Sequence, residues 1–384
     1  MFPYIFIILI LLFGAITEVF GKMKQTKFYF VISAILVALF AGLRYNTGAD
    51  WAIYESAFYQ IPKFGNIVHW EIGYYWINLI FYQLFGNYYA LQFAASVFLL
   101  YSVSRFLWKH TEYPIFSLLI FFIMFINNGI LMAQVRQSIA IAIIIFGYEH
   151  IINRSLGKFL CVVMLACMFH ISAIVALPMY LMTKRVPNFV LIISILVFQV
   201  FYFFPGIITG VIKIFLPYMP ERLEDIGNAY LTHFYYAKKV KFNTGTYYLA
   251  NVLLSTIVIS FIKNNSKERS FLLNALTIAI IIGTLSNAIS ILGRFMSYYL
   301  VFAIATYPLI FNLKISKIAQ KSSSLVMMLL LSVFFYVPLH TRLTSTTIDN
   351  VTDLPTNHSW NPYYNLISHP KKAETRVDRI SHKN

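Results

Sequence analysis

Charged residues are scarce in this sequence. Asp, Glu, Lys and Arg make up 11% of its 384 residues, against roughly 25% in soluble domains. Hydrophobic residues make up 59%, and apolar runs of about 15 to 25 residues recur along the chain. An ordinary soluble globular protein is therefore excluded. Because helices satisfy backbone hydrogen bonds inside lipid, the sequence predicts an all-α polytopic membrane protein.

Acidic residues and cysteines are also few. The 30 Lys and Arg residues exceed the 14 Asp and Glu residues, which gives a formal net charge of +16. This charge is spread over short connecting segments, which indicates membrane orientation and contact with anionic lipid, not a nucleic-acid partner. The two cysteines, Cys161 and Cys167, lie in an apolar segment without metal-ligand spacing. We therefore expect no structural disulfide, no metal and no cofactor.

Several sequence motifs are missing. There is no Asp-x-Asp pair, no Gly-rich phosphate loop and no Gly-x-Ser-x-Gly elbow. These absences count against nucleotide-dependent and serine-hydrolase chemistry. No internal repeat is visible, which weakens an inverted-repeat transporter. The first apolar run, 2–20, has no positive residue before it and no small-residue cleavage site after it, so we expect a retained span.

The hydrophobic segments define the expected topology. They fall near 3–20, 28–43, 70–85, 88–106, 114–128, 130–151, 158–182, 188–204, 247–262, 271–292, 294–312 and 324–339. The positive-inside rule places the basic loops near 22–27, 263–269 and 314–321 in the cytoplasm. The prediction is one polytopic membrane domain, 1–339, with external loops 44–69 and 205–246, followed by a hydrophilic external tail, 340–384.

The number of spans is open between ten and twelve. If all twelve segments crossed, the basic residues at 105–109 and 154–158 would lie outside, against the positive-inside rule. The segment 70–85 is rich in Tyr, Trp, Gln and Asn, which suits an interfacial helix. The segment 158–182 divides at His170 into halves of about 18 Å each, too short to span alone. We propose ten spans, one interfacial helix and one re-entrant hairpin with His170 near its tip, with both termini outside; twelve spans remain the conventional interpretation.

Two arginines lie within apolar segments. Arg136 is about 9 Å inside its expected helix, which is costly unless it faces a cavity or a partner; the alternative is snorkelling to the head groups. Ser286, Ser290 and Arg294 have helical spacing, with Asn287 beside them. They predict a polar stripe along one helix that walls an anionic-ligand cavity. The alternative is interhelical hydrogen bonding with an interfacial arginine.

Further charged residues border these segments. Arg44 and Asp50 follow an apolar run within RYNTGADWAIY. Asp50 is expected to have a chemical role or to cap a helix that starts at Trp51, and the two roles are compatible. Glu71 either contributes to a site or is a favourable negative charge at the N-terminal end of a helix dipole. A lone histidine such as His170 is more often a buried residue with satisfied hydrogen bonds than a catalytic one. Guanidinium groups bind phosphate oxygens, and a carboxylate or imidazole can deprotonate a sugar hydroxyl. These residues are therefore candidates for transfer from a lipid pyrophosphate.

With these residues in order, the chain resembles the EpsG-type, Wzy-like polysaccharide polymerases of bacterial cell membranes. The resemblance rests on Arg44, Gly48-Ala49-Asp50-Trp51 and Tyr54, on Glu71-x-Gly73-Tyr74, on Arg136-Gln137 with Ala140, on Phe169-His170-Ile171-Ser172-Ala173 before Pro178, and on Gly293-Arg294-Phe295. Ala49, Trp51 and Ile72 depart from residues common in the family, which bears on substrate fit more than on activity.

The resemblance implies a glycosyltransferase of the outer face of the bacterial cell (inner) membrane. Such a polymerase transfers a growing glycan of O-antigen, capsule or exopolysaccharide from undecaprenyl pyrophosphate to a lipid-linked acceptor repeat. The architecture would be similar to GT-C enzymes, whose first external loop carries an acidic site residue in the place of Asp50. A chain-length regulator and a flippase are the implied protein partners.

Roles follow from the resemblance and from the chemistry. Arg136 and Arg294 would hold the donor pyrophosphate, and either Asp50 or His170 would be the general base. Arg44 would either assist the donor arginines or bind the acceptor phosphates. The expected sugar-site residues are Tyr54, Glu71, Gln137 and Trp51. The competing hypotheses are a flippase of lipid-linked oligosaccharide and another outer-face transferase, a ligase or an acyltransferase.

Overall fold

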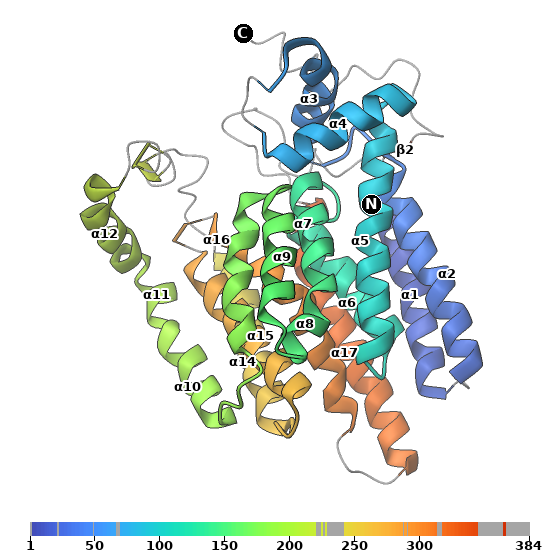
Figure 1. The fold of residues 1–384 in the computed structure, drawn as a ribbon. Coiled ribbons are helices and arrows are strands. Elements are labelled where there is room, and N and C mark those ends of the chain that lie inside the picture. The colour runs from blue at the N-terminus through green and yellow to red at the C-terminus, as the bar shows by residue number, and fades with distance from the viewer. Residues whose placement is uncertain are drawn as a thin grey trace. The chain divides into compact units, whose positions relative to one another are not determined.

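The computed structural model of the chain describes residues 2–20, 23–48, 50–66, 70–219, 224–225, 227–228, 242–286, 288–289, 291–312, 317–344 and 364–365. Nearly all of them are helical (Figure 1). The elements are α1 (Phe2–Phe20), α2 (Met23–Gly42), β1 (Arg44–Tyr45), α3 (Trp51–Phe64), α4 (Ile72–Phe85), α5 (Tyr88–His110), α6 (Pro114–Asn127), α7 (Val135–Phe146), α8 (Tyr148–Ile152), α9 (Leu156–Cys167), the 3-10 helix η1 (Ile171–Leu181), α10 (Asn188–Phe198), α11 (Val200–Phe203), α12 (Pro205–Phe215), η2 (Leu216–Tyr218), α14 (Phe242–Phe261), α15 (Lys267–Leu285), α16 (Leu292–Ala303), η3 (Ile304–Asn312), α17 (Lys317–Thr344) and β2 (Tyr364–Asn365).

The chain forms two compact units, and each is described by itself. The first contains Met1–Tyr148, Leu160–Ile174 and Lys314–Asn384, and the second contains Glu149–Phe159 and Val175–Leu313. In the first unit α6 packs against α1, α2, α5 and α17. Every residue of α6 from Pro114 to Ile126 is buried, as expected for a helix that is apolar on all sides and occupies the centre of a bundle.

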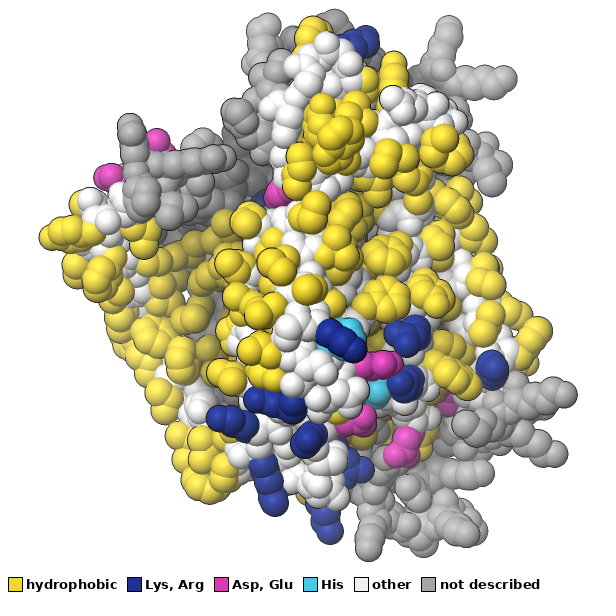
Figure 2. Space-filling model, viewed as in Figure 1, with side chains coloured by type: hydrophobic (Ala, Val, Ile, Leu, Met, Phe, Trp, Pro, Cys, Tyr) yellow, Lys and Arg dark blue, Asp and Glu magenta, His cyan; other side chains and the backbone are white. Residues whose placement is uncertain are grey.

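Length and composition bear out a polytopic membrane protein. Among the described residues, four helices are long and apolar enough to cross a membrane, and the bent pair Asn188–Phe203 and Pro205–Tyr218 makes up to five. Seven shorter apolar helices of 10–17 residues accompany them. Hydrophobic side chains cover most of the face seen in Figure 2, which suits contact with lipid. Which of these helices cross, and in which direction, stays a prediction.

The predicted break at His170 is present. α9 ends at Cys167 and η1 starts at Ile171, so each half has eleven or twelve residues. The chain turns back on itself, because the rings of Phe159 and Tyr180 stack with centroids 6.1 Å apart. The guanidinium of Arg154 lies 4.0 Å from the Tyr180 ring and donates to the Tyr180 carbonyl. Residues 156–181 therefore form a helical hairpin with its turn at 168–170, and its re-entrant placement stays a prediction.

The segment 205–246 does not begin as a loop. Residues 205–215 form α12, which starts with Pro205 at a position where a helix tolerates proline. α12 is bent by 82° from the preceding helix. Further along, α14 starts at Phe242, five residues before the predicted segment 247–262. Residues 220–223, 226 and 229–241 of the predicted loop lie outside the described residues.

The prediction that Ser286, Ser290 and Arg294 form a polar stripe along one helix is wrong. α15 ends at Leu285, and Ser286 is its C-cap, where the Ser286 hydroxyl donates to the carbonyl of Gly283 at 2.7 Å. The next helix, α16, starts only at Leu292, so no single helix joins Ser286 to Arg294. Asn287 and Ser290 lie outside the described residues. A serine that bonds back to its own helix can end that helix, which spacing alone does not reveal.

Two short helices, α3 and α4, lie over the end of the first unit at which α5 and α7 begin (Figure 1). α4 has 14 residues and is preceded by Glu71. The predicted C-terminal tail reaches the same region, because Tyr364–Asn365 pairs antiparallel with Arg44–Tyr45. α17 continues to Thr344, so helix occupies the first residues assigned to that tail, and 345–363 and 366–384 lie outside the described residues.

Candidate functional site

The start of α4 is fixed from two sides. Before the helix, the side chain of Asn66 accepts a hydrogen bond from the Trp70 amide at 2.7 Å and donates to the Trp70 carbonyl at 2.8 Å. Within the first turn, the Gly73 amide donates to the Met168 carbonyl at the hairpin turn, at 2.8 Å. A Cβ at Gly73 would lie 2.8 Å from the Met168 carbonyl oxygen, so glycine permits this approach. Glu71 is thereby held beside His170.

Glu71 joins two residues that are distant in sequence. Its Oε2 accepts a hydrogen bond from Arg136 Nη1 at 2.5 Å, and the two side chains are 16% and 20% exposed. Its Oε1 lies 3.2 Å from His170 Nδ1 and 3.3 Å from the Ile171 amide nitrogen. Arg136 is in the first turn of α7, and His170 is at the hairpin turn. Glu71, Arg136 and His170 form what we call the Glu71 cluster.

Aromatic rings surround Arg136. Its guanidinium carbon lies 4.4 Å from the centroid of Trp70 and 5.7 Å from the centroids of Tyr54 and Tyr74. The rings also contact one another, with Trp70 and Tyr74 centroids 5.6 Å apart. Cation–π contacts of this kind attract a cation to the ring faces and are stronger where water is excluded. α7 starts only at Val135, so the predicted position of Arg136 about 9 Å inside its helix is wrong. The predicted internal partners are present, and Arg136 does not need to snorkel.

The surroundings of Glu71 keep it ionised. Burial alone would raise its pKa, but the hydrogen bond with His170 and the charge of Arg136 outweigh burial and lower the pKa to about 2. An ionised carboxylate only accepts hydrogen bonds, so the 3.2 Å contact requires a proton on His170 Nδ1. In a neutral imidazole the lone pair is then on Nε2. Glu71 thus selects the tautomer in which Nε2 can accept a proton.

Arg44 is in a different environment from Arg136. It is 3% exposed, and its Nη1 donates to the Ala41 carbonyl and to Ser96 Oγ, the latter at 3.3 Å. Its own carbonyl accepts a hydrogen bond from Gln92 Nε2 at 2.8 Å. The side chain of Asn46, two residues on, accepts from the Tyr89 hydroxyl at 2.9 Å. These contacts fix the polypeptide that leads from α2 to Asp50.

Gly48 brings this loop against the approach to α7. Its φ is +108°, and a Cβ there would lie 2.3 Å from the Met132 carbonyl oxygen. Asp50 follows, half-buried, at the N-cap position of α3, but its side chain makes no capping hydrogen bond. The helix starts at Trp51 as predicted, but the prediction that the Asp50 side chain caps it is wrong. Ala49 lies outside the described residues.

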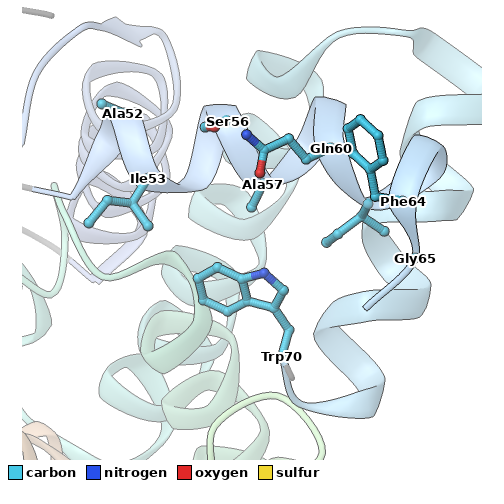
Figure 3. Close-up of a pocket in the computed structure, with 9 residues that line it drawn as sticks. Ala52, Ile53, Ser56, Ala57, Gln60, Phe64, Gly65 and Trp70 are labelled. Atoms are coloured by element: carbon cyan, nitrogen blue, oxygen red, sulfur yellow. The ribbon is translucent and has the colours of Figure 1, made fainter. Parts of the chain in front are cut away.

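A pocket adjoins the Glu71 cluster. Its volume is about 460 Å³, and Figure 3 shows the Trp70 indole facing Ile53, Ala57 and Gln60 of α3 across it. The lining residues are Ala52, Ile53, Ser56, Ala57, Gln60, Ile61, Phe64, Gly65 and Trp70. Trp70 belongs both to this pocket and to the ring set around Arg136. We call this the α3 pocket.

The structure brings together some of the predicted site residues. Glu71, Arg136, His170 and Tyr54 form one assembly, and Trp51 and Gln137 are buried on α3 and α7 in the same unit. Arg294 lies in the first turn of α16 in the second unit. All four residues of the assembly therefore belong to the first unit.

The sequence reasoning missed Trp70, and it named Tyr74 only within the Glu71-x-Gly73-Tyr74 motif, without a role in the site. The available signal was their position on either side of Glu71, within a segment that carries four aromatic residues in seven, 70–76. Aromatic residues are common in membrane-interface segments, so this composition did not single them out.

The helices and their apolar surface define an all-α polytopic membrane protein. The EpsG family model matches residues 27–364, and the chain belongs to the EpsG family. This membership supports a polysaccharide polymerase-like role in polysaccharide biosynthesis at a membrane. No curated protein and no solved structure matches the chain.

Proposed function

We propose that this protein polymerises surface-polysaccharide repeat units on the outer face of the bacterial cell membrane. In this proposal it is a glycosyltransferase that moves a growing glycan from undecaprenyl pyrophosphate to a lipid-linked acceptor repeat. The Glu71 cluster carries the proposal, because one carboxylate holds an arginine and a histidine side by side beneath aromatic rings. Arginine is suited to a pyrophosphate, histidine to a hydroxyl proton, and aromatic rings to a sugar.

The transfer step assigns one role to each group. His170 Nε2 takes the proton of the acceptor hydroxyl, whose oxygen forms a bond to the anomeric carbon of the donor sugar. The bond from that carbon to the pyrophosphate oxygen breaks, and undecaprenyl pyrophosphate leaves with the electron pair. Glu71 positions His170 and stabilises the imidazolium that forms, since a carboxylate on Nδ1–H favours the charged ring. His170 is therefore our choice of base over Asp50.

Arg136 supports the leaving group in this step. Only Nη1 is engaged by Glu71, and a guanidinium has five N–H donors in total. The Arg136 side chain is 20% exposed, so part of it is open to a ligand. A phosphate oxygen that accepts a hydrogen bond from this guanidinium would have its negative charge offset by the arginine as the pyrophosphate departs.

The remaining predicted residues have supporting roles in the proposal. Tyr54, Trp51 and Gln137 shape the sugar site, and Asp50 contacts the acceptor from the start of α3. The buried contacts of Arg44 favour positioning of the loop that carries Asp50 over binding of acceptor phosphates. Arg294 remains a candidate for the donor pyrophosphate.

The test compares variants in a strain that lacks the chromosomal copy. His170→Gln and Arg136→Ala should each abolish long polymer at wild-type protein level, while single lipid-linked repeats accumulate outside. The matched control is Lys63→Ala, an exposed residue of α3, which should restore wild-type polymer. Wild-type polymer length and amount in both site variants would refute the assignment. Repeats trapped inside would indicate a flippase instead, and long but unattached polymer would indicate a ligase.

A further inference from the structure

The α3 pocket has a chemistry unlike that of the Glu71 cluster. Of its nine lining residues, Ser56 and Gln60 carry polar side chains, and the indole N–H of Trp70 adds one further hydrogen-bond donor. Ile53 and Phe64 are 58% and 64% exposed, so large apolar side chains also stand at its edge. A saccharide would need several polar partners to replace the water that its hydroxyl groups lose on binding. The pocket is suited to a hydrocarbon.

The lining residues follow one face of α3. Ala52, Ser56, Gln60 and Phe64 are spaced four residues apart, so they lie in a row along the helix. From Ala52 to Phe64 this row is about 18 Å long at 1.5 Å per residue. A pocket built on such a row is elongated and suits a single extended chain.

Trp70 connects this row to the cationic group. Its indole lines the pocket, and Arg136 lies 4.4 Å from the centroid of the same ring. A ligand with its phosphate at Arg136 and its hydrocarbon along α3 would contact both. A polyprenyl phosphate has one chain for each phosphate or pyrophosphate group, whereas a bilayer phospholipid has two acyl chains. The pocket offers one row of residues along α3, beside one arginine, which suits a lipid with one hydrocarbon chain. A polyprenyl lipid therefore fits the pocket better than a bilayer phospholipid.

We propose that the α3 pocket binds the first isoprene units of the polyprenyl chain of the lipid-linked substrate, while Arg136 holds its phosphates. The proposal rests on the polymerase function proposed above. It assigns to α3 and Trp70 the recognition of the carrier lipid, separately from the sugar chemistry at Glu71 and His170.

The experiment uses the purified full-length protein and a radiolabelled polyprenyl monophosphate with a diazirine in an isoprene unit near the phosphate. Ser56→Trp fills the pocket from an exposed position, and Gln60→Trp does so one turn further along. The matched control is Lys63→Trp, which is exposed on α3 outside the pocket. Both pocket variants should lose photolabelling at least tenfold at an unchanged melting temperature. The control should label as the wild type does.

Competition identifies the chemistry of the occupant. Unlabelled polyprenyl monophosphate should compete, whereas phosphatidylglycerol and the soluble repeat oligosaccharide should not. Equal competition by phosphatidylglycerol would overturn the polyprenyl assignment in favour of a general lipid site, and competition by the oligosaccharide would overturn it in favour of a sugar subsite. Labelling of Ser56→Trp and Gln60→Trp at the wild-type level would overturn the pocket itself.

A parallel assay of polymer formation separates this proposal from the polymerase function. Pocket-dependent labelling by a protein that makes no polymer from lipid-linked repeats would refute the polymerase and leave the lipid site standing. Normal polymer formation by Ser56→Trp, with undiminished labelling, would refute the lipid site and leave the polymerase standing.

Discussion

The ion pair between Glu71 and Arg136 should be strongly coupled, and a double-mutant cycle can measure the coupling. Glu71→Gln keeps the shape of the side chain and removes its charge, whereas Arg136→Met keeps a long side chain among the aromatic rings. Each single substitution leaves the other charge partly buried without its counter-ion. The double substitution removes both charges.

The structure sets the expected magnitude. Exposed pairs contribute about 0.2–1 kcal/mol, and breaking a fully buried pair costs about 3–5 kcal/mol. The side chains of Glu71 and Arg136 are 16% and 20% exposed and joined at 2.5 Å, so they fall between these cases. We therefore expect a coupling free energy of about 2 kcal/mol.

The assay is the free energy of unfolding of the full-length protein in detergent, measured for the wild type, both single variants and the double variant. Additive effects within about 0.5 kcal/mol would refute the ion pair as described. The same cycle on polymer formation reports on function. Glu71→Gln should lower kcat about tenfold or more with little change in KM, because it weakens the alignment of His170 without removing the base.

The remaining predictions concern pH, backbone and topology. Because the pKa of Glu71 falls from 4.5 to about 2 on folding, the stabilisation that comes from its own ionisation is fully present above pH 4.5 and is lost as the pH falls toward 2. The stability difference between the wild type and Glu71→Gln should therefore shrink as the pH falls below 4.5, which unfolding at a series of pH values would measure. Gly48→Ala should destabilise the fold by roughly 2 kcal/mol or more, because its Cβ would clash with the Met132 carbonyl and its φ is positive. Gly157→Ala, whose Cβ would meet nothing within 4 Å, should lower the melting temperature by no more than a degree. Equal losses of stability in the two variants would contradict the close approach at Gly48. Single cysteines at Lys109 and Ser155 should resist an impermeant reagent added outside, and external labelling would rule out the ten-span hairpin topology.

The sequence predicted the features that depend on local pattern. The break of the apolar segment at His170 was predicted because this polar residue divides the segment into two halves of about a dozen residues each. Arg136 needed an internal partner, and this followed from the cost of burying a guanidinium. Such inferences use short stretches of chain and general energetics, and the structure confirms both.

The sequence did not reveal that Glu71 is the partner of Arg136 and His170. Glu71 precedes Arg136 by 65 residues and His170 by 99, and Gly73 lets α4 approach the Met168 carbonyl, two residues before His170. Glu71 was expected to contact sugar or a helix dipole, and its sequence context is compatible with either. Two other predictions were wrong because of local features. Ser286 donates a hydrogen bond to its own helix, which ends there, and the apolar α12 was assigned to a hydrophilic loop.

The antiparallel pairing of β1 with β2 sets an order of assembly. Tyr45 is paired with Tyr364, 319 residues later in the chain, and β1 leads into the loop that carries Gly48 and Asp50. During synthesis this loop emerges early, yet its backbone partner arrives only after α17 has been made. An amino-terminal fragment that stops before β2 would therefore contain the whole Glu71 cluster but leave the edge of the neighbouring loop unpaired.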